Sequence, residues 1–162
     1  MEEKIVDKIL ITTYTLTSLK RRLKALKSRL SEHFFGGDTN KGMMMDELEW
    51  LNSYGIQFLN DFNKESFYQS FTKIEEYVSK LKALTIYLAF EPKEEQAKQI
   101  GSWVRDLYSQ KMVIDFKYDP ELIGGSAFIW NGVYKDYSIR SRIQGDKERI
   151  LSSFKSFLAA KR

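Results

Sequence analysis

Residues 119–142 read DPELIGGSAFIWNGVYKDYSIRSR, and each part of this stretch has its own backbone preference. Asp119-Pro120 ends the strand before it, because proline has no N–H to donate to a β-ladder and restrains the residue ahead of it. Gly124-Gly125 allows positive φ or a close approach to a neighbouring element. Asn131-Gly132 stands between two short apolar runs and predicts a type I′ turn, which needs positive φ twice. We therefore expect a β-hairpin that is entered through a glycine turn.

A helix is predicted to follow this hairpin. Asp136 or Ser138 can accept hydrogen bonds from the free N–H groups at the start of a helix. The helix runs from about Ser138 to Ala160, and Gly145-Asp146 is the place where it can kink or split. Its apolar side is formed by Ile139, Ile143, Ile150, Phe154, Phe157 and Leu158.

Two segments ahead of the hairpin alternate between apolar and other residues. The first contains Leu84, Ile86, Leu88 and Phe90, and the second covers residues 112–118, so each predicts a strand. Pro92 suits the first turn of a helix between them. The predicted buried stripe of that helix is Ile100, Val104 and Leu107. A strand, a helix and a strand at this spacing predict a right-handed crossover and a parallel pair.

The first half of the chain has helical periodicity. Apolar residues recur every seven positions from about residue 3 to residue 34, which predicts one long helix. A segment rich in Gly and Asn, residues 35–42, predicts a break, and a second helix follows from Met43. A third helix places Phe67, Phe71, Ile74, Val78 and Leu81 at a spacing of four and three residues.

The predicted fold class is therefore α+β. Residues 1–82 form a helical domain of about three helices, of which the first is long. Residues 83–162 form a β-α-β-β-β-α domain with a mixed sheet and a long C-terminal helix.

The composition excludes several classes of protein. Hydrophobic residues make up 43% of the 162 residues and charged residues 30%, as in a globular protein. No cysteine is present, which excludes disulfides and thiolate metal sites. No apolar run approaches the roughly 20 residues that span a bilayer. We therefore expect a soluble protein inside the cell.

Catalytic chemistry has little support in the sequence. His33 is the only histidine, and it lies at the end of a predicted helix, where a packed or capping role is the usual one. Gly124-Gly125 precedes a strand rather than a helix, so it does not form a phosphate-binding loop. Arg140 can form a basic rim, or it can hold the hairpin through a carboxylate such as Asp136. No enzyme activity, cofactor or metal site is predicted.

The order of parts in residues 119–142 resembles the C-terminal domain of the delta subunit of F-type ATP synthases, which is the oligomycin-sensitivity-conferring protein in mitochondria. The family pattern is an Asp, a Leu/Ile-Gly-Gly, an apolar strand, a Gly turn and Asp-x-Ser-x-Arg before a helix. Its positions here are Asp119, Leu122, Ile123, Gly124, Gly125, Gly132, Asp136, Ser138 and Arg140. The family's N-terminal domain is normally a bundle of six helices, whereas this chain predicts about three before Lys82.

This resemblance implies a non-catalytic stator subunit in the peripheral stalk of a rotary ATP synthase. In that family the N-terminal domain binds the N-terminal segments of the alpha subunits, and the C-terminal domain binds the end of the b-subunit helices. It implies no cofactor and no small-molecule substrate. Its implied location is the cytoplasmic side of the inner or plasma membrane, with membrane contact only through the complex.

Two apolar helix faces are the expected partner-binding surfaces, because amphipathic helices recognise each other through such faces. We expect part of the first to stay available to a partner helix. The two sets are Leu16, Leu19, Leu23, Leu26 and Leu30 in the first helix and Ile150, Phe154, Phe157 and Leu158 in the last.

Two alternatives stay open at this point. The E-type stalk subunit of archaeal and vacuolar ATPases also joins a long N-terminal helix to a head with a Gly-Gly strand. That family usually has an Asn-Thr-x-x-x-Arg-like segment where this chain has residues 136–140, which favours the delta interpretation. The second is a nucleic-acid-binding adaptor, because residues 20–29 form a basic helix face that could follow phosphates, in a chain of net charge +4.

Overall fold

The computed structural model describes residues 2–36, 44–59, 62–108 and 111–160. The chain separates into two compact units. The first contains Met1–Lys82 and Ala97–Val113, and the second contains Ala83–Gln96 and Ile114–Arg162. The division at Lys82 into a helical and an α+β domain stays a prediction.

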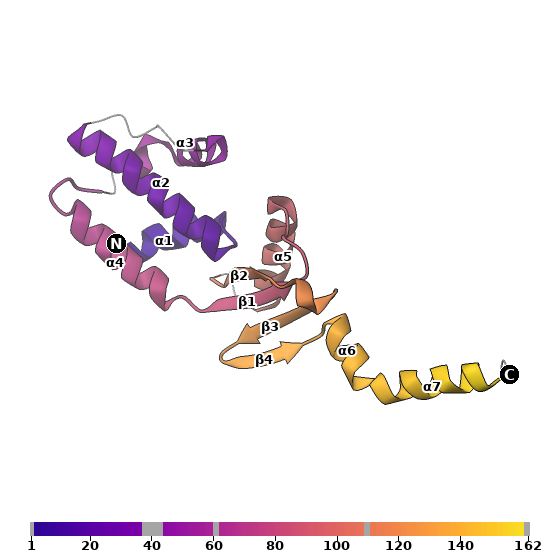
Figure 1. The fold of residues 1–162 in the computed structure, drawn as a ribbon. Coiled ribbons are helices and arrows are strands. Elements are labelled where there is room, and N and C mark those ends of the chain that lie inside the picture. Colours follow the sequence, from indigo (N-terminus) through magenta and orange to yellow (C-terminus); the bar gives the residue numbers. More distant parts are fainter. Residues whose placement is uncertain (1, 37–43, 60–61, 109–110, 161–162) are drawn as a thin grey trace. The chain divides into compact units, whose positions relative to one another are not determined.

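Helices build the first unit (Figure 1): α1 (Glu2–Ile11), α2 (Leu16–Phe35), α3 (Met45–Leu59), α4 (Phe67–Lys80) and most of α5 (Glu94–Leu107). Helix α1 packs against α4, and α2 packs against α3. The predicted stripe of the third helix is confirmed in α4, where Phe67, Phe71, Ile74 and Val78 are buried. The predicted break at residues 35–42 begins one residue later, because Phe35 is the last residue of α2 and Gly36 is its C-cap. Most of the rest of the break, together with Met43, lies outside the described residues.

The single helix expected over residues 3–34 is wrong, because the chain leaves the helical conformation between α1 and α2. Thr13 Oγ1 donates to the Ile9 carbonyl oxygen at 2.7 Å, and Thr15 Oγ1 accepts from Ser18 N–H at 3.1 Å. Threonine side chains compete for backbone groups in this way, and they favour helix caps over helix interiors. The described part of residues 1–82 thus holds four helices, and the first is short.

A mixed sheet of four strands is the centre of the second unit (Figure 1): β1 (Ala83–Leu88), β2 (Val113–Tyr118), β3 (Ser126–Trp130) and β4 (Val133–Asp136). The strand order is β2-β1-β3-β4. The β1–β3 and β3–β4 pairs are antiparallel, so β2 runs parallel to β1 in this mixed sheet. The α+β class and the order β-α-β-β-β-α are confirmed. Phe90 lies beyond the end of β1.

The hairpin predicted around Asn131-Gly132 is confirmed. Trp130 of β3 pairs with Val133 of β4, and the two residues between them have φ angles of 49° and 79°. Both positive values are those that a type I′ turn requires.

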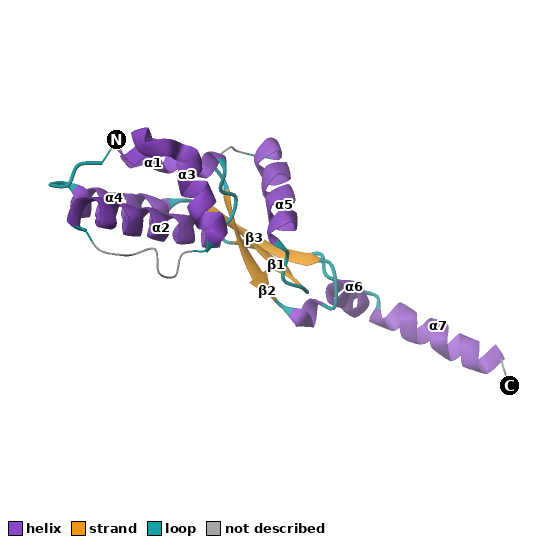
Figure 2. Cartoon of the chain, turned by 90° about the horizontal axis from the view of Figure 1, so that it is seen from above, coloured by secondary structure: helices purple, strands orange, loops and turns teal. Residues whose placement is uncertain are grey.

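The C-terminal helix is split at the predicted place into α6 (Ile139–Gly145) and α7 (Lys147–Ala160). No residue of either helix is buried, and in both views α7 extends beyond the sheet (Figures 1 and 2). Among the described residues, no helix combines the length and the hydropathy of a membrane-spanning segment.

The buried side of α5 differs from the predicted stripe. Val104 is buried as expected, but Leu107 is 57% exposed, and Gly101 and Arg105 are buried instead. A Cβ at Gly101 would lie 2.4 Å from the Cβ of Tyr14, so this helix approaches Tyr14 too closely for any larger residue. The close approach turns Arg105 inward, next to the turn between α1 and α2.

Candidate partner-binding surfaces

The glycine turn sets the start of α6. The short 3₁₀ helix η1 (Pro120–Leu122) begins at Asp119, whose Oδ1 accepts from Glu121 N–H at 3.0 Å. Gly124 then accepts from Ile139 N–H at 2.9 Å through its carbonyl oxygen. Gly125 has φ +78°, and a Cβ there would lie 2.6 Å from the carbonyl oxygen of Tyr137. Gly125 is therefore required by the backbone that leads into α6, whereas a Cβ at Gly124 would meet only the end of the Ile139 side chain, at 2.8 Å.

Asp136 and Ser138 cap this junction. Asp136 Oδ1 accepts from Ser138 N–H at 2.8 Å, and Ser138 Oγ accepts from Ser141 N–H at 3.1 Å. Ser138 is fully buried. Arg140 forms an ion pair with Glu121 of η1 rather than with Asp136, which corrects the expected partner. The motif residues Asp119, Gly124, Gly125, Asp136, Ser138 and Arg140 thus meet at one place, where they join η1, β4 and α6.

The cap has a measurable signature, because hydrogen bonds from Ser138, first from its hydroxyl and then from its backbone, lower the pKa of Asp136. A lowered pKa in the folded state contributes stability above the unfolded pKa, and this contribution is lost as the pH falls through the folded pKa. We predict that carbon-detected NMR titration places the pKa of Asp136 below its ordinary value of 3.8. Ser138→Ala should move this pKa upward, whereas a wild-type pKa of 3.8 or higher would contradict the cap.

The α7 apolar face consists of Ile150, Leu151, Phe154, Phe157 and Leu158. Their spacing places them on one side of the helix. Each is between 48% and 62% exposed, and a shallow hollow on the same side is lined by Ile150, Phe154 and Phe157. Contiguous exposed apolar surface of this kind marks an interaction site in a folded protein. All four residues predicted in this helix thus lie at the surface of the second unit.

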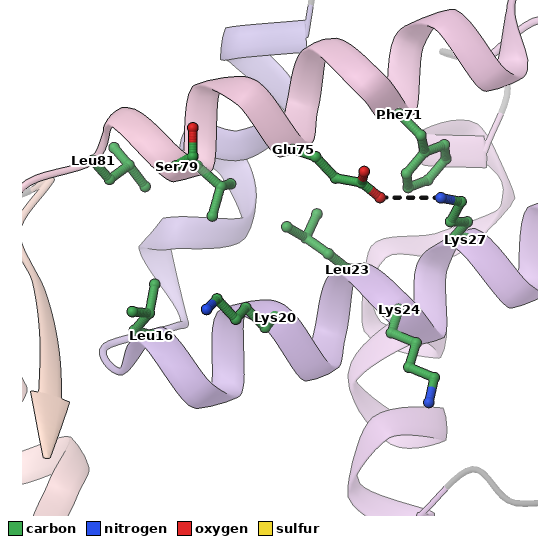
Figure 3. Close-up of a pocket in the computed structure, with 10 residues that line it drawn as sticks. Leu16, Lys20, Leu23, Lys24, Lys27, Phe71, Glu75, Ser79 and Leu81 are labelled. Carbon is green, nitrogen blue, oxygen red and sulfur yellow. Dashed lines mark hydrogen bonds and ion pairs between the residues drawn. The ribbon is translucent and has the colours of Figure 1, made fainter. Parts of the chain in front are cut away.

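A groove of about 670 Å³ runs between α2 and α4 in the first unit (Figure 3). Its apolar lining comes from Leu16 and Leu23 of α2 and from Phe71, Val78 and Leu81 on the side of α4. Three lysines of α2, at positions 20, 24 and 27, line it as well. Lys27 Nζ lies 3.0 Å from Glu75 Oε1, and this ion pair bridges the two helices.

The leucines predicted in α2 divide into two groups. Leu19, Leu26 and Leu30 have no exposed surface, because the helical unit buries them in its own core. Leu16 is half-buried and Leu23 is 7% exposed, and both line the α2–α4 groove. Only this pair therefore offers surface to another chain. A heptad pattern identifies apolar positions, but it does not identify which chain covers them.

The basic run at residues 20–29 is largely engaged inside the unit. Arg21 contacts Asp46 at 2.7 Å and Glu47 at 3.0 Å, Arg22 donates to the Thr12 carbonyl oxygen, and Arg29 pairs with Glu32. A surface that binds the phosphate backbone of a nucleic acid needs cations that are free to neutralise the phosphates. These contacts weigh against the nucleic-acid interpretation. Within the described ranges, no group of three or more His, Asp or Glu side chains could hold a metal ion.

The sequence alone does not indicate that Glu75 and three lysines of α2 line a groove. A basic run of this kind is typical of a solvated helix face, although the spacing of four and three residues places these lysines along one side of α2. Glu75 lies between Phe71 and Val78, whose apolar spacing dominates the pattern of α4.

A small α+β fold whose last described helix exposes an apolar face is typical of a subunit that binds other chains. The particular assembly follows from comparison with known families. The chain matches the family model of the ATP synthase delta (OSCP) subunit over residues 63–150, just over half of its length, and it belongs to that family. A search of curated proteins gives no match.

The family match confirms the resemblance seen in residues 119–142 and favours the delta-type over the E-type interpretation. It begins shortly before α4, contains the whole sheet and the glycine junction, and ends within α7. Members of this family are structural subunits of the ATP synthase peripheral stalk, in a membrane-associated complex.

Proposed function

We propose that this chain is a stator subunit of a rotary F-type ATP synthase and joins the catalytic head to the b-subunit stalk. It performs no chemistry itself and holds no cofactor. The helical unit binds the N-terminal segments of the alpha subunits, and the second unit binds the C-terminal end of the b-subunit helices. The protein lies on the cytoplasmic side of the inner or plasma membrane and reaches the membrane only through the complex.

The observation that carries this proposal is the α7 apolar face in a member of this family. Five large apolar side chains on an exposed helix are unfavourable in water, and burial against a partner helix would remove that cost. The glycine junction supports the same role. It fixes the direction in which the chain leaves the sheet, so that the C-terminal helices start from a rigid base.

Substitutions in α7 test the proposed binding of the b-subunit helices. We predict that Ile150→Ser with Phe154→Ser weakens binding of a C-terminal fragment of the b protein at least 100-fold in titration calorimetry. Each buried side chain of this size contributes about 1.5–3 kcal/mol, and about 1.4 kcal/mol is tenfold in affinity. The matched control is Ser152→Ala with Ser156→Ala, which changes two positions on the opposite side of α7.

The control variant should bind like the wild type. The binding surface would be in the wrong place if both double variants bound the fragment equally well. Circular dichroism of each variant establishes that the helices and the sheet are retained.

A further inference from the structure

We propose that the α2–α4 groove binds an amphipathic helix that carries acidic residues one turn apart beside its apolar stripe. The inference deepens the proposed function and rests on it, because it gives the position and the chemistry of the partner of the helical unit. The lining of the groove and its charge carry the inference.

The lining of the groove fits the apolar stripe of a helix. Leu16 and Leu81 at one end are half-buried, and Leu23, Phe71 and Val78 form a nearly buried floor between the helices. In Figure 3, Leu16 and Leu23 extend from α2 toward the side of α4. Amphipathic helices bind in such grooves through apolar side chains three and four residues apart.

The charges on the groove are not balanced. Lys20 and Lys24 are exposed, and neither has an ion-pair partner among the described residues, whereas Lys27 is paired with Glu75. Lys20 lies beside Leu16 at one end of the groove, and the Lys27–Glu75 pair lies toward the other end (Figure 3). The two lysines without an acidic partner leave the lining of the groove with a net positive charge. Complementary charge across an interface sets the choice and the register of the partner.

The spacing of the two lysines specifies the partner further. Residues four apart on a helix are about 6 Å apart along its axis. A partner helix that lies along the groove can present two carboxylates at the same spacing if they are also four residues apart. The proposed partner thus has acidic residues at positions i and i+4, next to its apolar stripe.

A second copy of this chain does not have this chemistry. The exposed amphipathic helix that it would offer is α7, which carries Lys147, Arg149 and Lys155 against a single acidic residue, Glu148. These cations would approach Lys20 and Lys24, and like charges at an interface are repulsive. The experiment must therefore distinguish binding of an acidic helix in the groove from self-association of the protein through the same groove.

The test uses the full-length protein and two synthetic helical peptides with the same leucine stripe. One has glutamates at i and i+4 beside the stripe, and the other has glutamines there. We expect the glutamate peptide to bind at least tenfold more tightly by fluorescence anisotropy, and added salt to reduce this difference. Lys20→Glu with Lys24→Glu should weaken binding of the glutamate peptide by at least tenfold and leave the glutamine peptide bound as before.

The matched control is Lys4→Glu with Lys135→Glu, the same change of charge at exposed positions that do not line the groove. Leu16→Ser should weaken the binding of both peptides to the same extent. Equal binding of the two peptides, or a loss of binding with the control variant as large as with Lys20→Glu and Lys24→Glu, would overturn the proposal. Self-association that the glutamate peptide does not compete away would overturn it too.

Failure of this inference can be distinguished from failure of the proposed function. If the wild type and Lys20→Glu with Lys24→Glu recover alpha subunits equally from native membranes, the stator role stands and the groove chemistry is wrong. If neither recovers any protein of the synthase, the stator role itself is wrong.

Discussion

Replacing Arg105 with methionine is expected to lower the free energy of unfolding of the helical unit by about 3–5 kcal/mol. Arg105 is 9% exposed, and its guanidinium donates to three backbone carbonyl oxygens, those of Leu10, Thr13 and Met112. Its Cζ lies 4.5 Å from the centre of the Tyr14 ring. Burial lowers the pKa of Arg105, with an opposing contribution from Tyr14. A guanidinium still remains charged and keeps its donors in a fixed fork.

The expected loss is large because one side chain satisfies acceptors from three segments. These are the end of α1, the turn before α2 and the residue that precedes β2. A buried acceptor that loses its donor costs about 1–3 kcal/mol, and water can replace only part of the bonds. Methionine has a similar length, so the effect reports the hydrogen bonds more than lost packing.

Guanidinium denaturation followed by circular dichroism measures this effect. Gln99→Met is the matched control, because it places the same residue at an exposed position of the same helix. It should change the unfolding free energy by less than about 0.5 kcal/mol. A change equally small for Arg105→Met would show that the three carbonyl groups do not depend on Arg105.

Gly125→Ala is expected to destabilise the second unit by about 2–4 kcal/mol. The alanine Cβ would lie 2.6 Å from the Tyr137 carbonyl oxygen and 3.1 Å from the Ser138 Cα. Both are backbone atoms in the cap of α6, so they cannot move aside without disrupting the hydrogen bond between Tyr137 N–H and Ser126 O at 2.9 Å. Positive φ adds a cost of about 1 kcal/mol for a residue with a side chain.

Gly132→Ala separates these two contributions. Gly132 has φ +79°, nearly that of Gly125, but a Cβ there would have no atom within 4 Å. We expect it to cost only about 1 kcal/mol, the part due to backbone strain. Thermal and chemical unfolding of both variants gives the difference. If the two substitutions cost the same, the close approach of Gly125 to the α6 cap is not what requires glycine there.

Local signals in the sequence predicted much of the second unit. Each of these signals depends on residues within a few positions of one another. They are the positive φ angles at Asn131-Gly132, the cap formed by Asp136 and Ser138, and the glycine turn. The ion pair of Arg140 with Glu121 joins residues 19 apart, so its partner could not be read from the local pattern.

The first unit shows where periodicity ceases to be informative. The heptad spacing continues on both sides of residues 12–15, with Thr12 at one of its positions, yet the side chains of Thr13 and Thr15 bind backbone groups where the helix is interrupted. The inward position of Arg105 has no signal in the sequence either, because a charged residue beside Val104 normally points to solvent. It follows from the contact of Gly101 with Tyr14, which are far apart in the chain.

The burial of Leu19, Leu26 and Leu30 likewise depends on tertiary packing. The same leucine pattern fits a helix that is covered by its own chain and one that is covered by a partner. In the structure Leu19, Leu26 and Leu30 lie in the core of the helical unit, whereas Leu16 and Leu23 line the groove between α2 and α4.

The most direct test of the stator role is affinity purification of the tagged chain from its native membranes, followed by mass spectrometry. We predict recovery of the alpha and b subunits of ATP synthase with the wild type. We also predict loss of the b subunit with Ile150→Ser and Phe154→Ser, and its retention with Ser152→Ala and Ser156→Ala. Recovery of ribosomal proteins or nucleic acid without any protein of the synthase would contradict the stator role.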